Sequence, residues 1–270
     1  MTTSPPLLTT EQDGILIATL NRPDKLNALN RETMELLTDA VIHFRNSHDL
    51  KVMLIRATGR YFCAGADLKG REEQKKISPT QHTASGIREN HRLNLNNMQQ
   101  LWDEMEHIEK PFVVAHQGMC VGGGLELSLS CDFRLAAKSA GYAFPEGQFG
   151  VLPASSGVSR LTRLCGPHWA RWLIMANKAA DADKALTMGL VHEVYPDESF
   201  ETDVMDFCQH LAKQNGEQMG AAKVAIELCA DVGRDQGRNI ERMANSALML
   251  NPAYLEGIQQ YIQGVGKKGS

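Results

Sequence analysis

The chain has 270 residues, of which 43% are hydrophobic and 22% are charged, and its formal net charge at pH 7 is −4. This composition is that of an ordinary globular protein and excludes a disordered, collagen-like or disulfide-scaffold chain. The acidic balance provides no basic field for nucleic acid, and the longest uncharged stretch, Pro111 to Leu125, is too short and too rich in glycine to cross a membrane. No basic residue precedes an apolar run near the first residue, so we expect no secretory signal and a cytoplasmic protein.

The first third of the chain predicts a β-α-β unit. Roughly the first 12 residues are expected to be a frayed lead-in, and the apolar run Gly14–Leu20 then predicts a strand. An amphipathic helix is expected to begin after Asn30, because asparagine is a favoured N-cap residue. The run Val52–Ala57 predicts a second buried strand.

The middle of the chain continues this alternation of strands and helices. The polar segment Gly70–Ser85 is expected to be a mobile surface segment, and Ile87–Ile108 predicts a long helix. Two further buried strands are predicted at Phe112–Ala115 and Phe133–Ala137. A short apolar helix is expected between these strands, opening at Gly122.

From about Phe200 onward strand signals vanish and helical periodicity dominates. We therefore divide the chain into a catalytic core, residues 1–195, and a helical C-terminal region, residues 196–270. The sequence contains no G-x-G-x-x-G dinucleotide motif, and the lysines that follow Gly264 lack the spacing of a P-loop. Neither a C-x-x-C pair nor a paired set of metal ligands occurs, so we expect reduced cysteines and no metal site.

Two glycine-containing segments follow predicted strands, Cys63–Leu68 and Val121–Glu126. Small residues let a ligand approach the backbone closely, and three glycines that open a helix present free N–H groups at its positive end. Two such N–H groups aimed at one point would form an oxyanion hole. The alternative interpretation is that these glycines serve only tight turns and packing.

Two carboxylates lie close to these segments in the sequence. Glu126 follows the three glycines within an apolar helix, and Glu146 lies in a glycine-rich loop. Two carboxylates in an apolar pocket can divide acid and base roles, because burial and mutual repulsion move their pKa values apart. Spacing alone also fits a helix N-terminal glutamate and an unrelated surface glutamate.

Five segments, in order along nearly the whole chain, resemble the enoyl-CoA hydratase/isomerase (crotonase) family. They are L-N-R-P-D-K-L-N-A-L-N (Leu20–Asn30), F-C-A-G-A-D-L-K (Phe62–Lys69), G-M-C-V-G-G-G-L-E-L-S-L-S-C-D (Gly118–Asp132), F-P-E-G-Q-F-G-V-L-P (Phe144–Pro153) and A-D-K-A-L-T-M-G-L-V-H-E-V (Ala182–Val194). The resemblance implies an α/β fold, a crotonase-like spiral of β-β-α units with a helical C-terminal region. It also implies that this region forms a homotrimer or a dimer of trimers.

The resemblance further implies a site that adds water to a 2-enoyl-CoA thioester by syn addition. The backbone N–H groups of Ala66 and Gly123 would form the oxyanion hole. Glu126 would act on the water and Glu146 on C2 of the substrate. Coenzyme A is then part of the substrate, so no cofactor is needed. The residues expected to contact the CoA moiety are Lys25, Ala28, Ala64, Asp67, Leu68 and Lys69, and Lys267 or Lys268 of a neighbouring subunit is a further candidate.

Several positions depart from the family pattern and leave other reactions open. Phe144 stands where glutamine is common, and Gly147 stands where an aliphatic residue is usual, so the acyl group of the substrate is not defined. An enoyl-CoA isomerase needs only one base at C2, and the presence of both glutamates favours hydration. A hydrolase or lyase could use the same oxyanion hole. The remaining alternative is an inactive relative that binds CoA or RNA.

Overall fold

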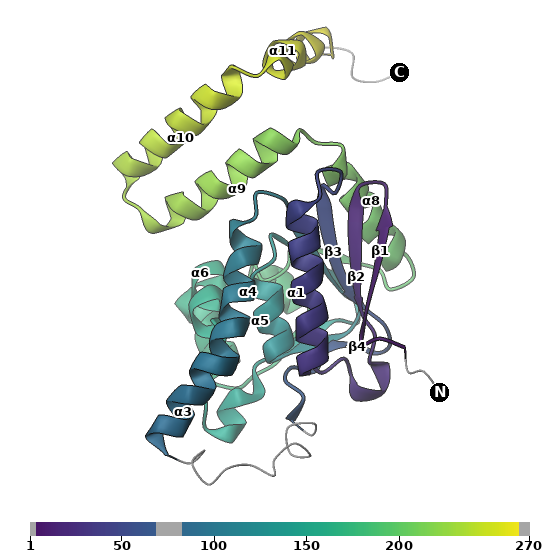
Figure 1. The fold of residues 1–270 in the computed structure, drawn as a ribbon, viewed down its shortest axis with the longest axis vertical. Coiled ribbons are helices and arrows are strands. Elements are labelled where there is room, and N and C mark those ends of the chain that lie inside the picture. The colour runs from purple at the N-terminus through teal and green to yellow at the C-terminus, as the bar shows by residue number, and fades with distance from the viewer. Residues whose placement is uncertain (1–3, 69–82, 265–270) are drawn as a thin grey trace. The chain divides into compact units, whose positions relative to one another are not determined.

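The computed structural model describes residues 4–68 and 83–264 of the chain (Figure 1). The expected surface segment Gly70–Ser85 therefore lies outside the described residues, apart from its last three positions, which lead into a helix. The chain forms two compact units, Met1–Lys213 and Gln214–Ser270. The helix α8 (Phe200–Ala212) packs on strands of the first unit, so this division falls later in the chain than residue 195.

The first unit contains a six-stranded sheet and a four-stranded sheet. The six-stranded sheet has the order β1 (Leu7–Gln12), β2 (Ile15–Leu20), β3 (Val52–Ala57), β5 (Phe112–His116), β7 (Phe133–Ala137), β10 (Glu193–Tyr195). Its strands are parallel except for β1, which is antiparallel to β2. The predicted strands at Gly14–Leu20, Val52–Ala57, Phe112–Ala115 and Phe133–Ala137 are thus confirmed.

The four-stranded sheet was not predicted from the sequence. Its order is β4 (Tyr61–Cys63), β6 (Met119–Val121), β8 (Gly141–Ala143), β9 (Ala180–Asp181). Strands of two or three residues are too short to show the period-two alternation that identifies a strand in sequence. Along the chain β3, β5 and β7 are each followed by a strand of this sheet and then by helix, so the expected spiral of β-β-α units is confirmed.

The expectation of a frayed lead-in is wrong for β1. The two residues between β1 and β2, Asp13 and Gly14, both have positive φ, 52° and 78°. A two-residue loop of this kind closes a tight hairpin whose twist matches that of its strands, and Asp-Gly is a favoured sequence for it. The hairpin pairs Gln12 with Ile15, so the local turn recruits the N-terminal residues into the edge of the sheet.

Helices cover the six-stranded sheet, whose strand β2 is almost wholly buried. Helix α1 (Arg31–Asn46) begins after Asn30 as predicted, and the Asn30 side chain accepts a 2.8 Å hydrogen bond from the Thr33 N–H. The expected long helix is present as α3 (Ala84–Asn90), the π-helical segment η3 (His91–Leu95) and α4 (Asn96–His107). Figure 1 shows α1 and α4 in front of the sheet and α8 behind it.

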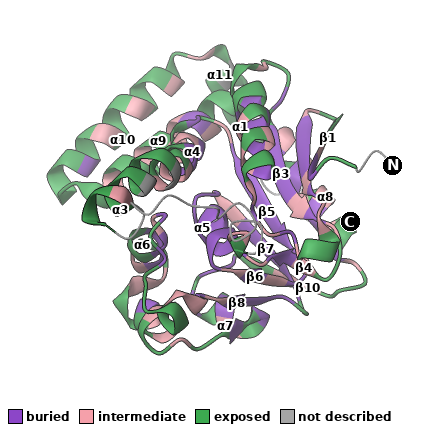
Figure 2. Ribbon diagram, turned by 60° about the horizontal axis from the view of Figure 1, so that its bottom comes forward, coloured by how far each residue is buried: buried purple, intermediate pink, exposed green. Residues whose placement is uncertain are grey.

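Helix α5 (Gly123–Leu129) lies at the centre of the first unit. Each of its residues is buried, and Figure 2 shows it in the colour of buried residues between the surrounding helices and strands. The remaining elements of this unit are η1 (Pro23–Lys25), η4 (Pro145–Phe149), α6 (Gly157–Ala170), η5 (Arg171–Met175) and α7 (Ala182–Thr187). A search of the described residues finds no helix long and apolar enough to span a membrane.

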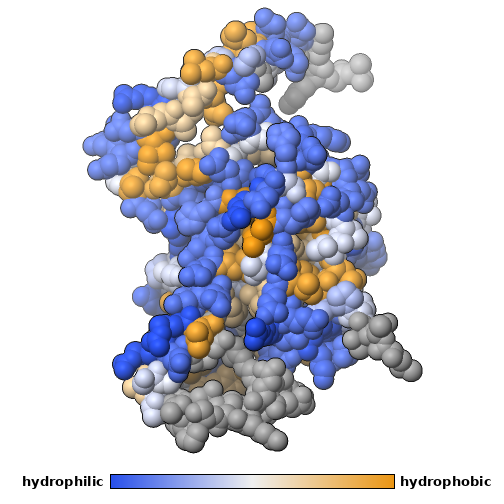
Figure 3. Space-filling view, viewed as in Figure 1, coloured by the Kyte–Doolittle hydropathy of each residue, from blue (hydrophilic) through white to orange (hydrophobic). Residues whose placement is uncertain are grey.

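The second unit consists of helices, as the sequence predicts for this part of the chain. They are α9 (Gly216–Asp231), α10 (Arg234–Met249) and α11 (Pro252–Gly264). Large apolar side chains lie exposed on all three helices, and Figure 3 shows apolar groups gathered there. The most exposed of them are Ile226, Met243, Leu250, Leu255, Tyr261 and Ile262.

The Asn30 cap can be tested by substitution. We expect Asn30→Ala to lower the free energy of unfolding by about 1 kcal/mol, because it removes the acceptor for an N–H group in the first turn of α1. Asn30→Asp keeps an acceptor oxygen and serves as the matched control. Urea unfolding followed by circular dichroism measures the change, and equal losses in both variants would contradict the cap.

Candidate active site

The spiral brings the two glycine-containing segments together. The strands β4 and β6 are parallel neighbours, and Cys63 and Cys120 are register partners, so the segments that follow both strands emerge at the same edge. A Cβ atom placed on Gly65 would lie 3.1 Å from the Gly123 nitrogen. One placed on Gly123 would lie 3.6 Å from the Ala66 nitrogen. The two backbone nitrogens expected to form the oxyanion hole are therefore close to each other.

The N–H group of Ala66 faces away from its neighbouring segment. Ala66 forms an isolated parallel bridge with Leu29, in which the Leu29 N–H donates to the Gly65 carbonyl at 2.7 Å and the Asp67 N–H donates to the Leu29 carbonyl at 3.0 Å. Leu29 makes both bonds of this bridge, so the Ala66 N–H points to the opposite side. It has no hydrogen-bond partner among the described residues.

The N–H group of Gly123 is free for a different reason. Gly123 is the first residue of α5, and the first N–H groups of a helix have no acceptor within that helix. The preceding Gly122 has a φ of 52° and a ψ of −123°, a backbone conformation that glycine adopts without the penalty of a side chain. Two unpaired N–H groups aimed at one region can bind an oxygen that carries negative charge.

The Glu126 carboxyl group is buried on α5. Only 5% of the residue is exposed, and its Oε1 accepts a 2.8 Å hydrogen bond from the Ser155 N–H. Burial raises the pKa of Glu126 to about 7, against the hydrogen bonds from Ser155 and Gly157 that lower it, and the charge of Glu146 raises it further. A Cβ atom on Gly123 would lie 3.8 Å from Oε2, so this second oxygen faces the helix start.

The Glu146 carboxyl group approaches from the other side, on the short helix η4. A Cβ atom on Gly122 would lie 2.7 Å from the Glu146 Oε1, so only glycine leaves room for this side chain. The Glu146 Oε2 is buried and has no hydrogen-bond partner among the described residues. Burial raises the pKa of Glu146 above its usual value. Both predicted carboxylates thus meet the two predicted N–H groups at the start of α5.

The expected CoA-binding residues lie on two adjoining segments. The Ala64 N–H donates to the Leu26 carbonyl at 2.9 Å, which joins the segment containing Lys25 and Ala28 to the one containing Asp67. Leu68 is 54% exposed, as a residue that contacts a ligand at the surface can be. Lys69, Lys267 and Lys268 lie outside the described residues.

Two residues of the site were not identified from the sequence. Ser155 holds the Oε1 of Glu126, and Arg22 forms a 2.8 Å ion pair with Asp67. Each contact joins two residues far apart in the chain, so a motif that contains one partner does not indicate the other. The ion pair also means that the Asp67 carboxylate is engaged within the protein.

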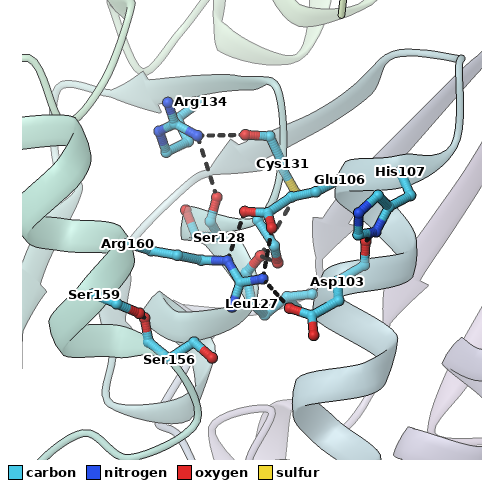
Figure 4. Close-up of polar contacts among 11 residues, drawn as sticks. Asp103, Glu106, His107, Leu127, Ser128, Cys131, Arg134, Ser156, Ser159 and Arg160 are labelled. Carbon is cyan, nitrogen blue, oxygen red and sulfur yellow. Dashed lines mark hydrogen bonds and ion pairs between the residues drawn. The ribbon is translucent and has the colours of Figure 1, made fainter. Parts of the chain in front are cut away.

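Two buried arginines hold the helices around this site. Arg160 on α6 bonds Asp103 and Glu106 on α4, with distances of 2.6 Å to each (Figure 4). Arg134 bonds the carbonyl groups of Cys131 and Ser128 at the end of α5, which the same view shows.

The buried His116 supports the same end of α5. Its two ring nitrogens lie 3.0 Å from the Ser128 hydroxyl and 3.0 Å from the Tyr142 hydroxyl. Burial lowers the pKa of His116 to about 3, so this side chain is neutral at pH 7 and binds α5 to β8 as a hydrogen-bonding group.

One departure from the family pattern, Gly147, has a structural explanation. A Cβ atom on Gly147 would lie 1.9 Å from the Nδ2 of Asn177, so the asparagine amide occupies the space that an aliphatic side chain would need. Phe144 is 2% exposed and belongs to the hydrophobic core. Among the described residues there is no group of three His, Cys, Asp or Glu side chains that could hold a metal ion.

Comparisons with known proteins give a consistent result. Residues 10–264 match the sequence profile described as enoyl-CoA hydratase/isomerase. The chain is 28% identical to the 2,3-dehydroadipyl-CoA hydratase of Escherichia coli (strain K12), with 95% of each chain covered. It is 33% identical to the short-chain-enoyl-CoA hydratase of Clostridium acetobutylicum, over 68% of this chain and 67% of the relative. The solved structure of an enoyl-CoA hydratase from Bacillus anthracis has a TM-score of 0.86 at 27% identity, with 96% of each chain covered.

The raised pKa of Glu126 predicts a pH-dependent stability. The pKa of Glu126 is about 7 in the folded protein, whereas the ordinary pKa of a glutamate is 4.5, so the stabilisation from protonated Glu126 is complete below about pH 4.5 and is lost as the pH rises through 7. Glu126→Gln removes this dependence. We expect the variant to gain roughly 1–3 kcal/mol in unfolding free energy relative to the unmodified protein between pH 4.5 and 8. Denaturant unfolding at a series of pH values measures the difference, and a difference that stays constant with pH would contradict the assignment.

Proposed function

The chain belongs to the enoyl-CoA hydratase/isomerase family, and from this we propose that it is an enoyl-CoA hydratase. The reaction adds water across the C2–C3 double bond of a 2-enoyl-CoA thioester, with hydroxyl on C3 and a proton on C2. One observation carries the proposal. The buried carboxyl group of Glu126 and the partly buried one of Glu146 flank two backbone N–H groups at the start of α5 that have no partner among the described residues.

The pair of N–H groups accounts for activation of the substrate. Attack of water on C3 moves negative charge onto the thioester oxygen and forms an enolate. The N–H groups of Ala66 and Gly123 would donate to that oxygen, and they are fixed before the reaction begins. Removal of one such donor costs roughly 3–4 kcal/mol of transition-state stabilisation in comparable sites.

The two carboxyl groups would divide the proton transfers. The Glu126 Oε1 is occupied by the Ser155 N–H, which leaves Oε2 to orient and deprotonate the water. Glu146, which would lie on the other side of the bound water from Glu126, would donate the proton to C2 on the same face of the substrate. This division needs one ionised and one protonated carboxyl group, and their raised pKa values make such a shared proton accessible near neutral pH. Each turnover leaves the proton from water on Glu126 and leaves Glu146 ionised, and transfer of that proton from Glu126 to Glu146 would return the pair to its starting state.

The CoA moiety would lie along the two joined segments next to the hole. Lys25 would bind a phosphate group, and Ala28, Ala64, Leu68 and Lys69 would contact the remainder. The proximity of these segments to Ala66 supports the assignment, since the thioester must reach the N–H group when the nucleotide end is bound.

Other reactions of the family remain as alternatives. An isomerase moves the double bond with one base at C2 and has no need for a second carboxyl group on the water. The presence of both carboxyl groups, Glu126 and Glu146, at the same point favours hydration. A hydrolase or lyase would use the same N–H pair but would release free CoA or break a carbon–carbon bond.

We also propose that the second unit builds a homotrimer or a dimer of trimers. Large apolar side chains lie exposed along this unit, as on a surface that binds another chain. Met243, Leu250 and Tyr261 are 72%, 86% and 75% exposed. Burial of such side chains against further copies of the chain would remove them from water.

The hydratase proposal predicts the effect of two substitutions. Crotonyl-CoA should lose its enoyl-thioester absorbance when the protein is added. Glu126→Gln and Glu146→Gln should each lower kcat by about 10²–10⁴-fold, the usual contribution of a general acid or base. Bound CoA ester with no change in absorbance across several chain lengths would contradict hydration. Full hydration by Glu126→Gln would contradict the role of that residue.

The proposed assembly is tested by native mass measurement. We expect a mass of three or six chains, and Met243→Glu should shift the population toward smaller species because it places a charge in the interface. Met175→Glu is the matched control, because Met175 is 76% exposed but lies in the first unit. A monomeric unmodified protein would contradict the proposal.

A further inference from the structure

We propose that Arg22 is a positioning residue, which holds the Ala66 N–H of the oxyanion hole in place from the CoA-binding segment. The inference rests on the proposed function. It adds a residue that does not itself touch the reacting atoms. Arg22 lies two residues after the end of β2 and directly before η1, whereas Ala66 and Asp67 follow β4 in the chain.

Arg22 contacts both segments with one side chain. Its Nη1 donates to the Ala28 carbonyl at 2.5 Å, and its Nη2 donates to the Asp67 Oδ2 at 2.8 Å. The two side chains of the ion pair are 17% and 12% exposed, so water has limited access to it. Asp67 directly follows Ala66, and its own N–H is bonded to Leu29. Arg22 therefore clamps the residue next to the oxyanion donor to the segment beside it.

The segment that Arg22 holds has an unfavourable backbone. Leu26 and Asn27 both have positive φ, 52° and 54°, which residues with side chains rarely adopt. The Asn27 side chain compensates: its Oδ1 accepts from the Arg22 N–H at 2.8 Å, and its Nδ2 donates to the Tyr61 carbonyl at 2.8 Å. Arg22 thus stabilises this turn through its backbone as well as through its guanidinium group.

The geometry of the clamp bears on catalysis because the bridge sets the direction of the Ala66 N–H. In this bridge the Leu29 N–H donates to the Gly65 carbonyl, and the Leu29 carbonyl accepts from the Asp67 N–H. A shift of Asp67 or of the segment at Ala28 would rotate the peptide that carries the donor. Misplacement of a reacting group by about 1 Å can cost about 100-fold in rate. A planar guanidinium can serve both acceptors at once, whereas a lysine ammonium cannot match that fork geometry.

The test combines kinetics with a spectroscopic measure of carbonyl polarisation. The variants are Arg22→Gln, Arg22→Lys and Asp67→Asn, each checked for folding by circular dichroism. Arg31→Gln is the matched control, because Arg31 forms a 2.7 Å ion pair with Glu35 that lies exposed on α1. The probe is butyryl-CoA labelled with ¹³C at the thioester carbonyl, which is saturated and cannot be hydrated. Difference infrared spectra report the carbonyl stretching frequency of the bound ester.

In the unmodified protein and in Arg31→Gln the bound carbonyl should absorb at lower frequency than in solution. Arg22→Gln should lose most of this shift and about 10- to 100-fold in kcat on crotonyl-CoA, with KM changed by no more than about threefold. Arg22→Lys and Asp67→Asn should retain part of the frequency shift and part of kcat, since each variant leaves one partner of the ion pair unchanged.

A folded Arg22→Gln variant with the full carbonyl shift and unchanged kcat would overturn the inference. So would a folded variant that raises only KM, because that would make Arg22 a binding residue alone. If Arg22→Gln does not fold, the intermediate shift expected of Asp67→Asn decides the question, and an unaltered shift there overturns the inference. No shift in the unmodified protein would instead contradict the proposed oxyanion hole itself, and the clamp with it.

Discussion

The site depends on the parallel pairing of β4 with β6, which forces two backbone segments into contact. The glycines are a consequence of this pairing. A Cβ atom on Gly65 would lie 3.0 Å from the Val121 carbonyl oxygen, and one on Gly124 would lie 2.5 Å from the Cβ of Cys63. Side chains at these positions would push the segments apart. Close approach leaves two N–H groups without partners among the described residues, one at a helix start and one on the outward side of a parallel bridge. The cost of leaving them unpaired is recovered only when an acceptor oxygen binds.

The buried carboxylates follow from the same arrangement. Helix α5 starts at the junction of the two segments and is wholly buried, so a glutamate in its first turn has little access to water. The loop that carries Glu146 reaches the same point because Gly122 has no side chain in its way. Burial raises both pKa values, which suits the proton transfers proposed for these groups. The helix itself is held at its far end by Arg134 and His116, neither of which reaches the carboxylates through a hydrogen bond in the described structure.

The sequence predicts the fold class and the longer strands, and its local patterns indicate the candidate site residues. The run of three glycines with Glu126, and Glu146 after Phe144-Pro145, are such patterns, and the structure brings these candidates together at the start of α5. The second sheet has strands too short for any periodicity, and β1 depends on a two-residue Asp-Gly turn that was not recognised as a hairpin. Ser155 and Arg22 act through contacts that join positions 29 and 45 residues apart, so no local pattern contains them. Asn177 likewise explains Gly147 only when both are seen in space.

The central claim is that this site adds water across the C2–C3 double bond of an enoyl-CoA ester, with the oxygen on C3. The most direct test is mass spectrometry of the products formed from a panel of enoyl-CoA esters in H₂¹⁸O. A hydratase built as described incorporates one ¹⁸O atom into the acyl chain at C3 and leaves the thioester intact. A product with a shifted double bond and no labelled oxygen, or free CoA with a labelled carboxylic acid, would contradict the account.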